Sequence, residues 1–65
     1  MSFHDFGAAA KTAHEYGIRA GQTEALMRWV HLSYGDGRDD AFYENVVMMI
    51  EIELQLLEEP NPFVE

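Results

Sequence analysis

The chain has 65 residues and contains no cysteine, so neither a disulfide nor a cysteine-ligated zinc can stabilise it. A chain of this length forms one domain at most and buries only about 60% of the surface that its unfolded form exposes. Small domains commonly compensate by disulfides, metals or oligomerisation, and oligomerisation is the device that this composition leaves open. The hydrophobic fraction of 48% is too high for a disordered chain.

The net charge of −8 is distributed unevenly along the chain. Residues 1–34 contain three acidic and three basic side chains, whereas residues 35–65 contain nine acidic side chains and one basic one, Arg38. An acidic surface of this kind repels phosphate backbones and attracts basic surfaces. It also keeps a small protein soluble without any further role.

Targeting and membrane signals are not recognised. The N-terminus lacks a basic region followed by an apolar run, so it does not resemble a signal peptide. No stretch approaches the ~20 apolar residues of a membrane span. We therefore expect a cytoplasmic protein without membrane contact.

The glycines divide the chain into three segments and a tail. Gly17 and Gly21 form one break, Gly35 and Gly37 form a second, and proline is absent before Pro60. The three segments predict helices over about 3–16, 23–34 and 39–59. We expect an all-α, three-helix domain over residues 1–59, followed by a proline-containing tail over 60–65.

The first helix is predicted from a cap and an apolar face. Ser2 and Asp5 have the spacing of an approximate capping box. One face, at helical spacing, consists of Phe3, Phe6, Ala10, Ala13 and Gly17. Its small residues would allow another helix to approach closely.

The second helix begins after Thr23, which can act as the N-cap. One side of it is lined by Leu26, Trp29, Val30 and Ser33. Gly35 is well placed to end this helix in a left-handed conformation.

The third helix, capped by Asp39 or Asp40, is the longest and the most apolar. A heptad seam for lengthwise helix packing consists of Tyr43, Val47, Ile50, Leu54 and Leu57. Met48 and Ile52 lie on a further face, so the apolar surface nearly encircles the helix. Because two short companions can cover only part of it, we expect a homodimer or a partner to cover the rest. The candidate self-association residues are Tyr43, Val47, Ile50, Leu54, Leu57, Met48 and Ile52.

Residues 50–56 also support a rival interpretation. Apolar and polar side chains alternate over this segment, as in a half-buried strand. The helix is favoured, because leucine, methionine, glutamate and glutamine are good helix formers and no partner strand is evident.

The sequence offers no constellation for catalysis or metal binding. His4, His14 and His31 are ten and seventeen residues apart, whereas metal ligands on one helix lie three or four apart. The acidic loop over 35–40 lacks the ligand spacing of a calcium-binding EF-hand. A domain this small has little room for a catalytic pocket. We expect no enzyme, no cofactor and no metal.

The segment over 13–18 resembles the centre of a helix-turn-helix, with a small residue at Ala13, a glycine at Gly17 and an aliphatic at Ile18. The resemblance implies DNA contacts by Arg19, Gln22, Thr23 and Arg28. An extra glycine in the turn and a total of four basic residues disfavour DNA binding. A helix-turn-helix DNA-binding regulator is therefore an alternative.

An acidic face is the other candidate site. Its residues are Asp36, Asp39, Asp40, Glu44, Glu51 and Glu58, and Glu59 extends it. Carboxylates on one face can mimic the phosphates of nucleic acid and block a basic, nucleic-acid-binding protein. They can equally form the solvated side of an amphipathic helix.

Three functions therefore follow from the sequence. The favoured one is a small protein-interaction module, a regulator or adaptor that associates with itself through the third helix. The alternatives are an acidic inhibitor of the phage or plasmid type that mimics nucleic acid, and the helix-turn-helix regulator. The tail tripeptide Asn61-Pro62-Phe63 matches a peptide that certain endocytic adaptor domains bind, but a helix stop at Pro60 explains it better.

Overall fold

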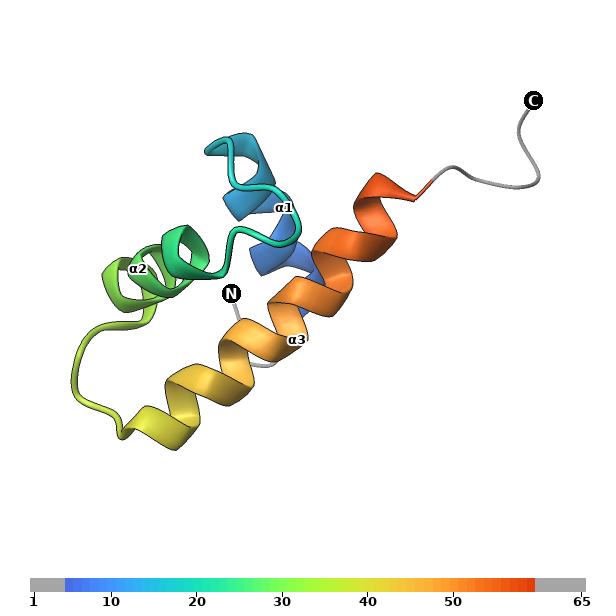
Figure 1. The fold of residues 1–65 in the computed structure, drawn as a ribbon. Coiled ribbons are helices and arrows are strands. Elements are labelled where there is room, and N and C mark those ends of the chain that lie inside the picture. Colours follow the sequence, from blue (N-terminus) through green and yellow to red (C-terminus); the bar gives the residue numbers. More distant parts are fainter. Residues whose placement is uncertain (1–4, 60–65) are drawn as a thin grey trace, which may run out of the picture.

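A computed structural model describes residues 5–59, which form three α-helices joined by two turns. Helix α1 spans Phe6–Glu15, α2 spans Thr23–Tyr34 and α3 spans Asp40–Glu58 (Figure 1). The predicted all-α, three-helix fold is confirmed. The described residues contain no strand, so the segment 50–56 is helical and its alternation does not reflect a strand.

Helix α1 is capped by Asp5, whose carboxylate accepts a hydrogen bond from the Ala8 backbone N–H at 3.0 Å. We expected Asp5 inside the helix, as the third residue after a Ser2 cap, and this assignment is wrong. An aspartate is itself a strong N-cap, and the helix begins directly after it. Ser2 and Phe3 lie outside the described residues.

Helix α2 begins without a side-chain cap. The expected cap, Thr23, is the first helical residue, and Gln22 occupies the N-cap position. The Gln22 side chain turns back instead, and its Oε1 accepts a hydrogen bond from the Arg19 N–H at 2.7 Å. At the other end, Gly35 has a φ of +84°, which confirms the predicted glycine stop.

Helix α3 is capped by Asp39, whose carboxylate accepts a hydrogen bond from the Phe42 N–H at 2.9 Å. The preceding loop is fixed by Tyr43. Its hydroxyl donates to the Gly35 carbonyl and accepts from the Arg38 N–H at 3.2 Å. The ring of Tyr43 also lies against His31, with ring centroids 3.9 Å apart.

Helices α1 and α2 each pack on α3 and scarcely touch one another (Figure 1). The core therefore lies along one side of α3. From α1 it receives alanines, which let the two helix backbones approach closely, and from α2 it receives larger side chains. Its buried residues are Ala9, Ala10, Ala13, Ile18, Leu26, Trp29, Val30, Tyr43, Val46, Val47, Ile50 and Leu54.

Two glutamates of α3 hold the turn between α1 and α2 against the helix. The Gly21 N–H donates to Glu51 Oε2 at 2.7 Å, and the Ala20 N–H donates to Glu58 Oε2 at 2.8 Å. The His14 side chain lies beside it, with its Nε2 3.8 Å from the same Glu58 oxygen. We call Glu51 and Glu58 with these two amides the turn latch. The latch fixes where the α1–α2 turn sits on α3.

None of the three helices over residues 5–59 combines the length and the apolar content that a bilayer span requires.

Candidate functional site

Helix α3 has two apolar faces, of which one is buried in the core and the other is partly exposed to solvent. The expected heptad seam forms the inner face, where Tyr43, Val47, Ile50 and Leu54 are at most 5% exposed. These four residues lie in the core of the chain itself, so a second copy could not reach them without unfolding the domain. Their assignment to self-association is corrected on this ground. Leu57, the last seam residue, stays 43% exposed.

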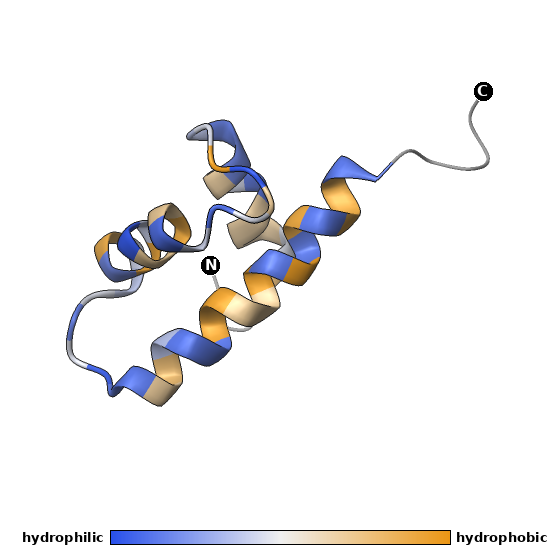
Figure 2. Cartoon of the chain, viewed as in Figure 1, coloured by the Kyte–Doolittle hydropathy of each residue, from blue (hydrophilic) through white to orange (hydrophobic). Residues whose placement is uncertain are grey.

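The outer face of α3 carries four apolar side chains that the described residues cover only in part. Met48, Met49, Ile52 and Leu56 are 41–57% exposed. Their spacings of three and four residues make them neighbours on the helix surface. We call them the outer stripe. Apolar positions accordingly recur along the whole of α3, and not only where α1 and α2 cover it (Figure 2).

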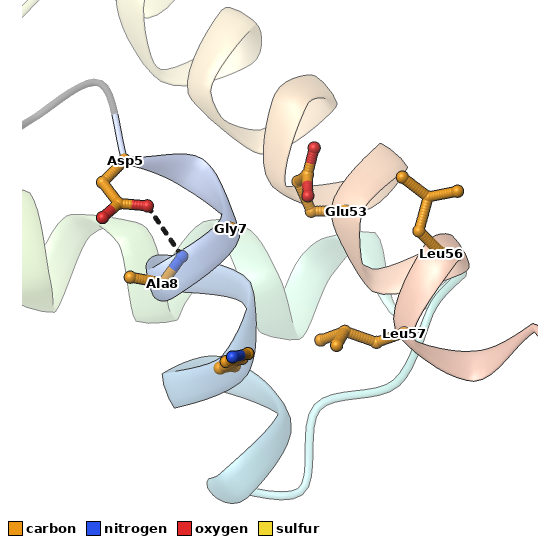
Figure 3. Close-up of a pocket in the computed structure, with 7 residues that line it drawn as sticks. Asp5, Gly7, Ala8, Glu53, Leu56 and Leu57 are labelled. Atoms are coloured by element: carbon orange, nitrogen blue, oxygen red, sulfur yellow. Dashed lines mark hydrogen bonds between the residues drawn. The ribbon is translucent and has the colours of Figure 1, made fainter.

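A groove runs beside the outer stripe, between the start of α1 and the last turns of α3. Its volume is about 450 Å³. We call it the α1–α3 groove, and its lining is Asp5, Gly7, Ala8, Lys11, Glu53, Leu56 and Leu57. Leu57 points from α3 towards α1, and Glu53 projects from the preceding turn of α3 (Figure 3). Leu56 belongs to both the groove and the outer stripe, so the two form one continuous surface.

The small residues of α1 create this groove. A Cβ at Gly7 would lie 3.5 Å from Glu53 Oε1, so the glycine lets the Glu53 side chain lie close to the α1 backbone. Ala8 adds only a methyl group beside it. Because neither residue is large enough to cover Leu57, that side chain is left half-exposed.

The charges around this surface are mostly negative. Helix α3 contains no lysine or arginine over its 19 residues. Its carboxyl end, where the helix dipole is negative, also carries Glu58 and is followed by Glu59. Among residues 5–59, Lys11 is the one basic side chain that lines the groove. The surface is therefore apolar along its centre and acidic along its borders.

The predicted acidic face does not act as one surface. Glu51 and Glu58 are the acceptors of the turn latch, and Glu51 Oε1 is enclosed without a hydrogen-bond partner among the described residues. Asp39 caps α3, and Asp36 lies 2.7 Å from His31 Nδ1. Asp40 and Glu44 are exposed near the start of α3. Four of the six residues thus make contacts within the fold, and of these only the cap at Asp39 was predicted from the sequence.

The residues assigned to DNA contact lie in and after a turn of seven residues, Tyr16–Gln22, which is longer than a helix-turn-helix connection. Arg19 donates from its guanidinium to the His14 carbonyl at 3.2 Å, and Gln22 accepts from the Arg19 N–H. Thr23 and Arg28 are exposed on α2. Because α1 and α2 scarcely touch, the packed helix pair of that motif is not formed.

A second, smaller apolar hollow of about 380 Å³ lies on the opposite part of the domain, beside α2. Leu32 and Tyr16 stand at its edge and are 86% and 75% exposed. Trp29 and Arg28 also line it. Tyr16 belongs to the turn after α1 and Leu32 to α2, so the two exposed side chains at this hollow come from different elements.

Within residues 5–59, no group of three or more histidines and carboxylates could hold a metal ion. His14 and His31 lie at different places in the fold, one beside the turn latch and the other against Tyr43. His4 lies outside the described residues.

Neither a family model, nor a curated protein, nor a solved structure matches this chain. The surface itself is thus the basis for any functional statement. Met48 and Ile52 were predicted as contact residues from the sequence, whereas Met49, Leu56 and the groove were not. The spacing of Met49, Ile52 and Leu56 was a usable signal, whereas nothing local in the sequence brings Gly7 next to Glu53.

Proposed function

We propose that the protein is a small protein-interaction module, a regulator or adaptor whose contact surface is the outer stripe of α3 with the adjoining groove. The observation that carries this proposal is the outer stripe itself. Four neighbouring apolar side chains stay about half exposed, although the same helix buries its other apolar face. Contiguous exposed apolar patches with polar borders commonly mark interaction sites.

The proposal is tested by comparing two exposed positions. Tagged wild-type protein, Ile52→Glu and Leu32→Glu are each used to capture partners from nuclease-treated lysate of the source cells. Ile52 lies in the stripe, whereas Leu32 lies on α2. We expect a stoichiometric partner that Ile52→Glu loses and Leu32→Glu retains. A partner lost equally with both variants, or captured only without nuclease, would contradict the assignment.

Self-association through the same stripe is the second candidate. The spacing of Met49, Ile52 and Leu56, three and then four residues, is the one that helices use to pair lengthwise. Sedimentation equilibrium at tens of micromolar tests it. A dimer that Ile52→Glu converts to a monomer would support this candidate, and a wild-type monomer would exclude it.

Fewer carboxylates support mimicry of nucleic acid than the sequence suggested, because Glu51 and Glu58 already accept hydrogen bonds within the turn latch. A mimic would bind its target with an affinity that falls steeply with salt. Contact held by the apolar stripe would weaken less with salt, because charges only border it. The salt dependence of any captured complex therefore separates the two.

A further inference from the structure

We infer that the outer stripe and the α1–α3 groove receive an amphipathic helix whose apolar residues are bordered by lysine or arginine. This inference rests on the proposed function and names the chemistry of the partner. The shape of the surface, its charges and the poor fit of a second copy each support it.

The surface has the shape that a helix requires. From Met48 to Leu57, α3 offers nine residue steps, or roughly 14 Å, which matches two to three turns of a helix lying alongside. Gly7 and Ala8 line the α1 side of the groove, whose volume is about 450 Å³. Leu56 and Leu57 provide apolar contact on the other wall (Figure 3). A helix in this position would insert residues spaced by three and four.

The borders of the surface select a basic partner. Among residues 5–59, Glu53 and Asp5 line the groove together with one cation, Lys11 of α1, and α3 itself contains no lysine or arginine. The C-terminal end of α3 adds its negative dipole. Lysine or arginine on either side of the partner's apolar residues would meet these carboxylates. Such borders contribute mainly to the association rate and to specificity, while the apolar residues hold the complex.

A second copy of this chain fits the surface less well. Each copy has a net charge of −8, and pairing two α3 helices through the stripe would bring two helices without any basic residue together. Four half-exposed side chains also offer a few hundred Å² at most, well below the ~800 Å² per partner of a standard interface. A single helix with opposite charge avoids the repulsion and needs less area.

Two synthetic 18-residue peptides test the inference. Both carry the same leucines at helical spacing, and one has lysine where the other has glutamate at all bordering positions. The readout is the ¹³C methyl resonances of the methionines in the full-length protein. Met48 and Met49 lie in the outer stripe, whereas Met27 lies on α2 and serves as the internal control.

We expect the lysine peptide to shift the methyl signals of Met48 and Met49 saturably and to leave that of Met27 in place. The glutamate peptide should bind at least ~10-fold more weakly, because it places like charges together. Ile52→Glu and Leu56→Glu should each weaken the lysine peptide by about tenfold or more, as expected for a central apolar anchor. Glu53→Lys should weaken it about two- to fivefold, the size of an exposed charge pair. Glu24→Lys, an exposed change on α2, should leave its affinity unchanged.

Three results would overturn the inference. One is equal binding of the two peptides, another is a shift at Met27 as large as those in the stripe, and the third is a wild-type dimer whose stripe the peptide cannot enter. If Ile52→Glu abolishes partner capture from lysate while neither peptide binds selectively, the interaction module stands and the basic helix fails. If Ile52→Glu changes neither capture nor peptide binding, both proposals fail.

Discussion

The inner and outer faces of α3 contain similar side chains and have opposite environments. Ile50 is fully buried against α1 and α2, while Ile52, two residues along the same helix, is about half exposed. Neither residue type nor helix propensity separates them. The difference arises because two short helices cover only one side of a longer one. An apolar residue of α3 therefore stabilises the fold if it lies on the inner face, and is available to a partner if it lies on the outer face.

The largest expected effect contrasts these two isoleucines. Ile50→Ala removes fully buried methyl groups and leaves a cavity, so we expect a loss of about 2–5 kcal/mol in the free energy of unfolding. Ile52→Ala should change it by less than ~0.5 kcal/mol, as usual for an exposed position. Urea denaturation followed by circular dichroism measures both. Similar losses for the two variants would mean that the outer stripe is covered in solution.

Two glutamates of α3 allow the same comparison for charged side chains, since Glu51 is hydrogen-bonded within the fold and Glu44 is exposed. Glu51→Ala removes the acceptor of the Gly21 N–H, and we expect a loss of about 1–2 kcal/mol, since hydrogen bonds to charged groups exceed the average. Glu44→Ala, the exposed control one seven-residue step earlier, should stay within ~0.5 kcal/mol. Equal stabilities of the two variants in urea would show that the turn latch adds nothing to the fold.

The turn latch also gives Gly21 a fixed conformation. Its φ of +91° lies in the region that side chains disfavour, so Gly21→Ala should cost about 1–2 kcal/mol. Gly37→Ala is the matched control, because Gly37 has no positive φ and open space around its Cα. Thermal unfolding of both variants checks this, and a Gly21→Ala protein as stable as the control would argue against the described turn.

Tyr43, in the first turn of α3, holds the preceding loop, because its hydroxyl is hydrogen-bonded to the Gly35 carbonyl and to the Arg38 N–H. Tyr43→Phe keeps the packing and removes these hydrogen bonds, so we expect a loss of about 0.5–1.5 kcal/mol in the free energy of unfolding. Tyr16→Phe, at an exposed tyrosine, should have no effect. Wild-type stability of the Tyr43→Phe protein in urea would show that the loop needs no such anchor.

The smallest effect concerns pH. Burial, assisted by the nearby Asp5 carboxylate, raises the pKa of Tyr34 above its usual value near 10. The folded state therefore holds this proton more firmly than the unfolded state. The resulting stabilisation is complete below pH 10 and is lost as the pH rises through the folded-state pKa. Urea titrations between pH 9 and 11 should show a steeper decline for wild type than for Tyr34→Phe. Parallel curves would rule out a contribution from Tyr34.

The sequence by itself determined the helices, most of their ends and the inner face, because these features depend on neighbouring residues. Gly35 stops α2, Asp39 is one of two expected caps of α3, and Tyr43, Val47, Ile50 and Leu54 share a face through their spacing. Each follows from the helical period and from local hydrogen bonding.

Only the tertiary structure decided what lies opposite each face. Glu51 and Glu58 accept hydrogen bonds from backbone amides that are 30 and 38 residues away in sequence. The sequence alone therefore could not distinguish them from solvent-exposed carboxylates. The groove likewise depends on Gly7 facing Glu53 across two helices. The angle and extent with which α1 and α2 cover α3 arise from packing among distant residues, and this coverage is what leaves the outer stripe exposed.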